Sequence, residues 1–316
     1  MKYKISMIIW LIIIATLGTL GFVFTSQPLS NLQLETLKIL GIICGASVLY
    51  CFVVGEISRN NSQMDKLWSI LPIAYAWVIA GMGGMKPRLI IIAVLVSLWG
   101  IRLTYNFAKK GAYSIKFWSG EEDYRWIYLR KQKVLSNKFV WCLFDLLFIS
   151  LIQNALVLGI TLPGLAIMES EVSFGIVDII ATILMVVFLF IEIIADYQQN
   201  KFQVKKYEYL NKGMKLNEIP EPYCRGFNIK GLWGVMRHPN YLGEQGFWIS
   251  LYLFVIGAGV ANYGVFNWSM IGSMVLVMIF IGSSRMAESI SVKKYSEYKD
   301  YQDVVFKYLP LRKYKK

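Results

Sequence analysis

Apolar runs long enough to cross a bilayer recur along this chain of 316 residues and constrain its fold more than any other feature. A membrane-spanning helix needs about 20 mostly apolar residues. Because lipid cannot satisfy backbone N–H and C=O groups, and no run alternates like a β-strand, we predict an all-α, polytopic bundle of about eight membrane helices. The expected spans are residues 5–25, 36–56, 67–85, 89–108, 138–160, 172–194, 241–259 and 266–283.

Composition and charge placement support a membrane protein. Hydrophobic residues make up 56% of the chain and charged residues only 17%, which is below the quarter typical of soluble domains. The net charge of +13 comes from basic residues in the segments 109–138, 195–239 and 284–316. Under the positive-inside rule this pattern places both termini in the cytoplasm, although Lys86 and Arg88 lie on the predicted outer side. We expect the bacterial cytoplasmic membrane, with membrane lipids and not nucleic acid as the partner of the basic loops.

Residues 1–316 are predicted to form one integral membrane domain without internal repeats. The run from Ile5 to Phe24 is too long for a signal peptide, so residues 1–30 are interpreted as an extra N-terminal helix. His238 is the only histidine, which excludes histidine-rich iron sites and H-E-x-x-H zinc sites. The sequence predicts no metal site, although a site built from carboxylates alone stays open.

The stretch GLWGVMRHPNYLGEQGFW, residues 231–248, concentrates polar chemistry at the start of an apolar helix. Pro239 suits the first turn of a helix. The free N–H groups at the start of that helix, with Arg237 and His238 beside them, favour an anion such as a phosphate. An intramembrane carboxylate such as Glu244 indicates a functional site by default. The alternative is an ordinary interface with snorkelling cations and a belt tryptophan. One face of the helix carries Asn240, Glu244 and Trp248 at i, i+4 spacing.

A second polar stripe lies in the stretch 191–210. Its members fall within about 60° on a helical wheel and are suited to hydrogen-bond a ribose, a carboxamide or a base edge. The alternative is a helix that emerges into water with one solvated face. The stripe consists of Glu192, Asp196, Gln199 and Gln203.

The tail 283–310 and the first half of the chain hold further candidates. Arg285 and Glu288 follow the last span, and tyrosines recur every three residues from Tyr295, so the tail is either a lid over an anionic cofactor or a helix lying on anionic lipid.

In the first half, Asp65 and Gln153 are candidates for a polar cavity, with helix–helix hydrogen bonds as the alternative.

Taken together, these motifs resemble the steroid 5α-reductase superfamily, in particular a bacterial branch. The resemblance covers about residues 60–310 and is carried by four stretches and an Asp-x-x-Trp pair. They are GLWGVMRHPNYLGEQGFW, EIIADYQQNKF (192–202), LWGIRL (98–103), YSEYKDYQDVVFKYLP (295–310), and Asp65 with Trp68.

The resemblance implies a helical membrane bundle that holds NADPH in a cavity open to the cytoplasm and transfers hydride to an activated C=C bond of a lipid-soluble substrate. It implies cofactor contacts for Glu192, Asp196, Asn240, Glu244 and Trp248. Residues around the phosphates or ribose would be Arg237, His238, Tyr241, Arg285 and Glu288, and the tail with Tyr295 would be a lid.

At the substrate end the sequence departs from the family pattern. Steroid reductases polarise an enone oxygen with a glutamate and a tyrosine. The position nearest to that tyrosine is Trp99, which has no hydroxyl, and the nearest acid is Asp65. We expect Asp65, together with Gln153, to orient or protonate the substrate in a dry cavity.

Two other functions stay open at this point. A membrane methyltransferase of the isoprenylcysteine or phospholipid type shares the R-H-P-x-Y turn and a downstream glutamate followed by tyrosines, and it would bind S-adenosylmethionine in the same pocket. A lipid transporter or scaffold is the non-catalytic alternative, but the chain shows no matched pair of broken helices.

Overall fold

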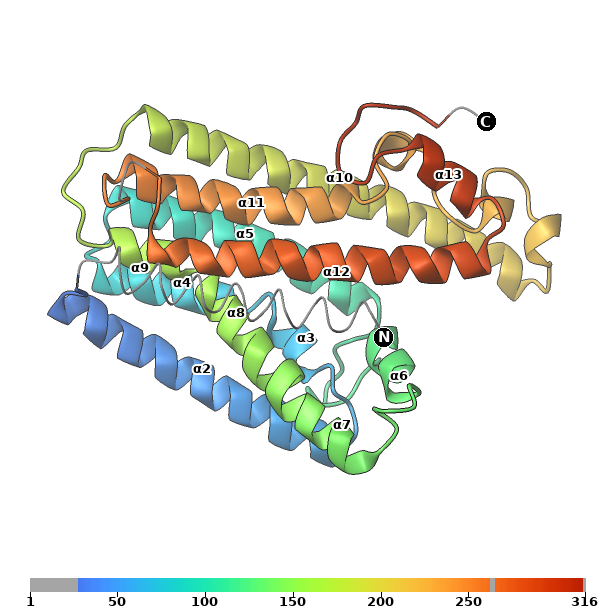
Figure 1. Ribbon diagram of the computed structural model, residues 1–316, viewed down its shortest axis with the longest axis horizontal. Helices are drawn as coiled ribbons and strands as arrows, with labels where there is room; N and C mark the ends of the chain where they lie inside the picture. The colour runs from blue at the N-terminus through green and yellow to red at the C-terminus, as the bar shows by residue number, and fades with distance from the viewer. Residues whose placement is uncertain (1–27, 262–264, 315–316) are drawn as a thin grey trace. The chain divides into compact units, whose positions relative to one another are not determined.

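The computed structural model describes residues 28–261 and 265–314, and within these ranges the chain is helical, with no β-strand (Figure 1). The all-α prediction is therefore confirmed. Five long apolar helical stretches indicate a membrane protein, and the predicted count of eight spans is not confirmed. These five are Asn31–Ser58 (α2), Pro87–Lys109 (α5), Lys138–Ile167 (α7, η1, α8 and α9 in succession), Ile176–Asn211 (α10) and Trp268–Lys294 (η5 and α12).

The remaining predicted spans differ for local reasons. The span expected at 67–85 is divided between α3 (Gln63–Leu67) and α4 (Leu71–Met82). At 12 residues, α4 is about 18 Å long, which is short of a hydrocarbon core of about 30 Å. The span expected at 241–259 is α11 (Pro239–Gly257), whose first two turns carry polar side chains that lower its hydropathy. The span expected at 5–25 lies outside the described residues.

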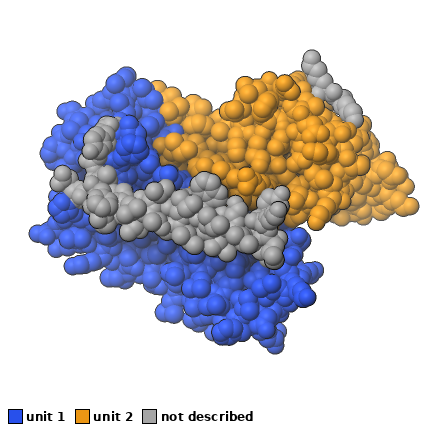
Figure 2. Space-filling model, in the orientation of Figure 1, with its two compact units in different colours: residues 1–182, 250–276 blue, residues 183–249, 277–316 orange. Residues whose placement is uncertain are grey.

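The described residues divide into two compact units, coloured in Figure 2. Unit 1 contains residues 28–182 and 250–276, and unit 2 contains residues 183–249 and 277–314. The prediction that these residues form one domain stays a prediction.

In unit 1, α2 packs against η1 and α8, and α4 packs against α5. A capping box of Ser30 and Gln33 begins α2, and the Asn137 side chain caps α7. Between α7 and α8 the backbone forms the π-helix η1, a rare feature that is frequent at functional sites. The bounds of the segments not yet given are Tyr124–Arg130 (α6), Lys138–Phe144 (α7), Asp145–Ile152 (η1), Gln153–Gly159 (α8), Leu162–Ile167 (α9), Trp268–Met270 (η5) and Ile271–Lys294 (α12).

In unit 2, α11 lies directly against α10. A Cβ atom on Gly243 would sit 2.3 Å from Cγ of Glu192 and 2.9 Å from the carbonyl oxygen of Phe188, so only glycine allows this approach. On its other side α11 meets α12, where the rings of Tyr241 and Phe280 pack edge to face at 4.7 Å. Shorter elements complete the unit: Leu216–Glu218 (η2), Tyr223–Arg225 (η3), Gly231–Gly234 (η4) and Tyr298–Val304 (α13).

The tail is packed into unit 2 by aromatic side chains. Tyr298 and Tyr301 in α13 are buried in one apolar cluster with Phe227, and Tyr295, in the turn before α13, packs against the same ring. The tyrosines therefore do not form one face of a continuous helix, because α12 ends at Lys294. Burying aromatic rings removes a large apolar area from water and fixes the tail to the unit.

Candidate functional site

Two buried carboxyl groups lie on the adjacent helices α10 and α11. Glu192 is fully buried and Glu244 is 6% exposed. Glu244 accepts a hydrogen bond of 3.2 Å from the indole N–H of Trp248, one turn along α11, and Trp248 is itself fully buried. Because Gly243 allows Glu192 to pack against the α11 backbone, the two carboxylates belong to one helix–helix seam. Three of the predicted cofactor residues are thus brought together.

The polar stripe continues along α10 toward the start of α11. The side-chain amide of Asn240 donates a long hydrogen bond of 3.5 Å to Asp196, and its oxygen accepts from the backbone N–H of Tyr241. The Oε1 atom of Gln199 is buried and has no hydrogen-bond donor within the described ranges. A buried acceptor without a donor costs about 1–3 kcal/mol, so this atom is suited to receive a ligand N–H or O–H.

The next residue group surrounds the carboxylate of Glu288 on α12. Its Oε1 atom accepts hydrogen bonds from Nε of Arg237 at 2.8 Å and from Nε2 of His238 at 2.9 Å. Its Oε2 atom accepts from the amide of Gln302 at 3.1 Å and lies 3.8 Å from the ammonium group of Lys307. The predicted residues Arg237 and His238 and two further residues, Gln302 and Lys307, therefore surround one mostly buried carboxylate.

The imidazole of His238 is held in its neutral form by its surroundings. Burial lowers the pKa of His238 below its usual value, and the adjacent Glu288 carboxylate only partly opposes this. Burial also lowers the pKa of Lys307. The positive charge of Arg237 lowers it further, and the negative charge of Glu288 partly opposes the shift. A neutral imidazole donates from Nε2 to Glu288 and keeps Nδ1 as an acceptor.

The tail binds the backbone N–H groups that immediately precede α11. The N–H groups of Arg237 and His238 donate to the carbonyl oxygens of Phe306 and Lys307, each at 3.0 Å. The guanidinium of Arg237 also donates through Nη1 to the carbonyl oxygens of Gln302 and, very closely, Val305. The chain's own tail therefore satisfies the backbone donors that precede α11 and part of the Arg237 guanidinium, whereas an anion at the first turn of α11 stays a prediction.

The other predicted cofactor residues of unit 2 have different surroundings. Tyr241 stacks on His238 with ring centroids 5.1 Å apart. Arg285 is exposed on α12, one turn before Glu288. Tyr295 packs on Gly226, where an added Cβ would lie 2.1 Å from the tyrosine ring.

The three predicted catalytic residues lie in unit 1. Asp65 in α3 accepts hydrogen bonds from Arg125 at 3.0 Å and from the indole of Trp126 at 2.6 Å. Burial raises the pKa of Asp65, and the Arg125 charge opposes the shift. Trp99 in α5 is fully buried, and Gln153 at the start of α8 is 7% exposed. The partners of Asp65 thus come from α6, which sequence reasoning did not connect with it.

Some residues of the site were missed from the sequence. Gln302 and Lys307 complete the surroundings of Glu288, and the hydroxyl of Tyr308 lies 3.2 Å from Oγ of Ser284. Gln302, Lys307 and Tyr308 lie in the stretch YQDVVFKYLP, which carries part of the family resemblance. The sequence assigned no role to these polar residues.

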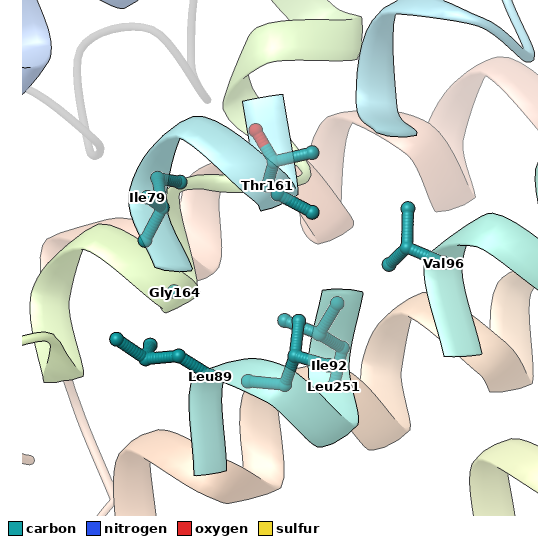
Figure 3. Close-up of a pocket in the computed structure, with 8 residues that line it drawn as sticks. Ile79, Leu89, Ile92, Val96, Thr161, Gly164 and Leu251 are labelled. Carbon is teal, nitrogen blue, oxygen red and sulfur yellow. The ribbon is translucent and has the colours of Figure 1, made fainter. Parts of the chain in front are cut away.

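One small apolar pocket of unit 1, with a cavity volume of about 10 Å³, lies between α4, α5, α9 and α11 (Figure 3). A single water molecule needs about 10–15 Å³ and drug-sized ligands occupy about 300–1,000 Å³, so this pocket is far too small for a dinucleotide. None of the predicted site residues lines it. The lining consists of Ala76, Ile79, Leu89, Ile92, Val96, Thr161, Gly164 and Leu251.

Comparison with known proteins gives a family. The family described as "Protein of unknown function (DUF1295)" matches residues 51–305. The chain belongs to this family. An uncharacterized protein of Schizosaccharomyces pombe is 34% identical over 290 residues, which cover 83% of this chain and 78% of the yeast protein. No solved structure matches.

The DUF1295 match contains every site residue predicted from the sequence, from Asp65 to Tyr295, and Lys307 and Tyr308 lie just beyond its end. It begins inside α2, so the predicted N-terminal span precedes the matched region. The seam of α10 and α11, and Glu288 with its partners Arg237, His238 and Gln302, therefore lie in the family region of the chain.

Proposed function

We propose that this DUF1295 protein is a membrane-embedded reductase that uses NADPH to reduce an activated C=C bond of a lipid-soluble substrate. The resemblance to the steroid 5α-reductase superfamily supplies the reaction class. The observation that carries the proposal is the buried polar seam of α10 and α11, in which the Gln199 Oε1 acceptor lacks a donor. We further propose a bacterial cytoplasmic membrane location with both termini in the cytoplasm, and membrane lipids but no nucleic acid as partners.

The residues of the seam fit a dinucleotide by their chemistry. Carboxylates at Glu192, Asp196 and Glu244 accept hydrogen bonds from ribose hydroxyl groups, and the oxygen of Gln199 accepts from a carboxamide or an adenine amino group. Trp248 covers Glu244 with an apolar ring that excludes water. The exposed guanidinium of Arg285 suits the phosphates, since the Arg237 guanidinium is already bound to Glu288.

In the proposed reaction NADPH supplies the hydride. Asp65, Trp99 and Gln153 are the candidates for the substrate end, and the chain must also supply one proton. Burial raises the pKa of Asp65, which is the direction a proton donor requires, and the Arg125 charge opposes this shift. Arg237 and His238 act through Glu288: they hold the tail against the start of α11.

The test is cofactor binding by the detergent-purified protein, measured calorimetrically with NADPH, NADH and S-adenosylmethionine. The decisive variant is Gln199→Leu. It removes an acceptor that has no donor among residues 28–261 and 265–314, so folding is preserved while NADPH binding weakens about tenfold, or 1.4 kcal/mol. Glu208→Gln, an exposed change on the same helix, is the matched control.

The alternative is a methyltransferase that uses S-adenosylmethionine. It is favoured by one observation, the position of Glu288 between Arg237 and His238, which fits the downstream glutamate of that group. Binding of S-adenosylmethionine without NADPH would establish the alternative and reject the reductase. Absence of binding by all three compounds at millimolar concentration would reject both.

A further inference from the structure

A buried carboxyl group in unit 1 lacks a cationic partner. Asp145 begins η1 and is 1% exposed, seven residues (about 10 Å) beyond Lys138, where the apolar stretch starts. Within the described part of the chain no ion pair joins it to a lysine, arginine or histidine. An isolated buried charge is so costly that such a group binds a proton instead.

A second carboxyl group lies beside the first. Glu56, near the end of α2, is exposed and directly follows Gly55, where an added Cβ would lie 3.4 Å from Oδ2 of Asp145, so the Glu56 charge acts on Asp145. Two neighbouring carboxylates resist ionising together, so a pair of this kind retains one proton. The other titratable groups nearby are the thiols of Cys142 on α7 and Cys51 on α2. Neither supplies a positive charge.

A buried amide points into the same space. The guanidinium of Arg130 donates to Oδ1 of Asn61 at 2.7 Å, which fixes the orientation of the amide. The opposite atom, Nδ2, is buried and has no acceptor within the described ranges, although Asn61 is only 4% exposed. A Cβ built on Gly55 would lie 3.5 Å from this Nδ2 atom and 3.4 Å from Oδ2 of Asp145. Both polar atoms therefore face one small space above Gly55.

The identity of these groups restricts what the space can hold. An amide N–H donor repels a metal cation and suits a carboxyl oxygen, which accepts hydrogen bonds. On the other side of Asp145, the hydroxyl of Ser150 lies 3.5 Å from Oδ1. Arg130, the nearest cation on α6, is engaged with Glu122 at 2.6 Å as well as with Asn61. The surroundings thus fit a proton and not a metal ion.

We propose that Asp145 and Glu56 form a proton-binding site in unit 1. The two groups share one proton, which transfers when an O–H bond breaks at Asp145 and an O–H bond forms at Glu56. Glu56 is exposed two residues before α2 ends at Ser58 and exchanges the proton at the end of the helix, while the buried Asp145 retains it inside the apolar stretch. Such a pair supplies or accepts a proton for chemistry in the membrane, and the proposal does not depend on the reductase.

Dicyclohexylcarbodiimide tests the proposal, because this apolar reagent adds to protonated carboxyl groups in apolar surroundings. The full chain in lipid nanodiscs is treated between about pH 6 and 9, and the adducts are located by peptide mass spectrometry. We expect an adduct at Asp145 that decreases as the pH rises. In Glu56→Gln, loss of the neighbouring negative charge lowers Asp145 labelling at the upper end of this range about tenfold. Asp303→Asn, an exposed change, leaves the profile unaltered.

Two results would overturn the proposal. One is the absence of an Asp145 adduct at every pH, and the other is an identical labelling profile in wild type and Glu56→Gln. Infrared spectroscopy gives an independent measurement at neutral pH. Asp145→Asn mimics the neutral acid, so the protein stays folded and loses one carboxylic-acid C=O band. A difference spectrum without that band would show that Asp145 is ionised, and the shared proton would be rejected.

Discussion

Oε1 of Glu288 lies 2.8 Å from Nε of Arg237 and 2.9 Å from Nε2 of His238, so one oxygen joins two consecutive residues to α12. The side chains of Arg237 and Glu288 are only 12% and 9% exposed. A mostly buried charge that loses its partner is far more costly than a broken surface ion pair.

Glu288→Gln is expected to destabilise the protein by about 3 kcal/mol, because the Arg237 and Lys307 charges are left without their carboxylate. Thermal unfolding in detergent measures this loss. The control is Asp303→Asn, whose partner Lys299 is 63% exposed, and which should cost about 1 kcal/mol or less. Equal effects of the two changes would mean that Glu288 is not an internal anchor.

The stability of the protein should fall at acidic pH through His238. Burial lowers the pKa of His238, so the folded state binds a proton less readily than the unfolded state. The neutral ring contributes its full stability above the pKa of the unfolded state, which is about 6.5. This stability is lost as the pH falls from there through the lowered pKa of the folded state. The loss is at most about 1.4 kcal/mol per pH unit. His238→Gln should remove this component. The measurement is the difference in melting temperature between the two proteins from about pH 7.5 to 5. A difference that is constant across this range would contradict the prediction.

The sequence predicted those parts of the fold and site that depend on local pattern. Long apolar stretches identified α2, α5, α10 and α12, because length and hydropathy are local properties. The stripe of Glu192, Asp196 and Gln199 followed from helical periodicity alone.

What the sequence could not predict depends on partners that are distant in the chain. The bonds from Asp65 to Trp126 and from His238 to Glu288 join residues 61 and 50 positions apart. The periodicity of residues within one helix does not indicate which distant segment of the chain contacts that helix. The tail carbonyl oxygens at Phe306 and Lys307 were missed for the same reason, since a backbone acceptor has no sequence signature.

Asp65 is expected to anchor α6. Asp65→Asn weakens the contacts with Arg125 and Trp126, so the helix opens more often and trypsin reaches Lys131 sooner. Loss of a hydrogen bond to a charged group is worth about 1.5–3 kcal/mol, so cleavage at this site should accelerate about tenfold or more. Time courses followed by mass spectrometry provide the rate. The control Glu121→Gln changes an exposed carboxylate in the preceding loop and should not alter it. If the cleavage rate at Lys131 is the same in Asp65→Asn and in the wild type, Asp65 does not anchor α6.

Gly243→Ala tests the seam of α10 and α11. The added methyl group would lie 2.3 Å from Cγ of Glu192 and 2.9 Å from the carbonyl oxygen of Phe188, so the helices must separate or the carboxylate must move. Overpacking of this kind costs about 1–3 kcal/mol. Gly45→Ala in α2 is the matched control, because a Cβ there meets nothing within 4 Å and alanine is the better helix former by about 1 kcal/mol. Thermal unfolding should therefore shift in opposite directions for the two variants. A Gly243→Ala protein as stable as Gly45→Ala would show that Glu192 is not packed against α11.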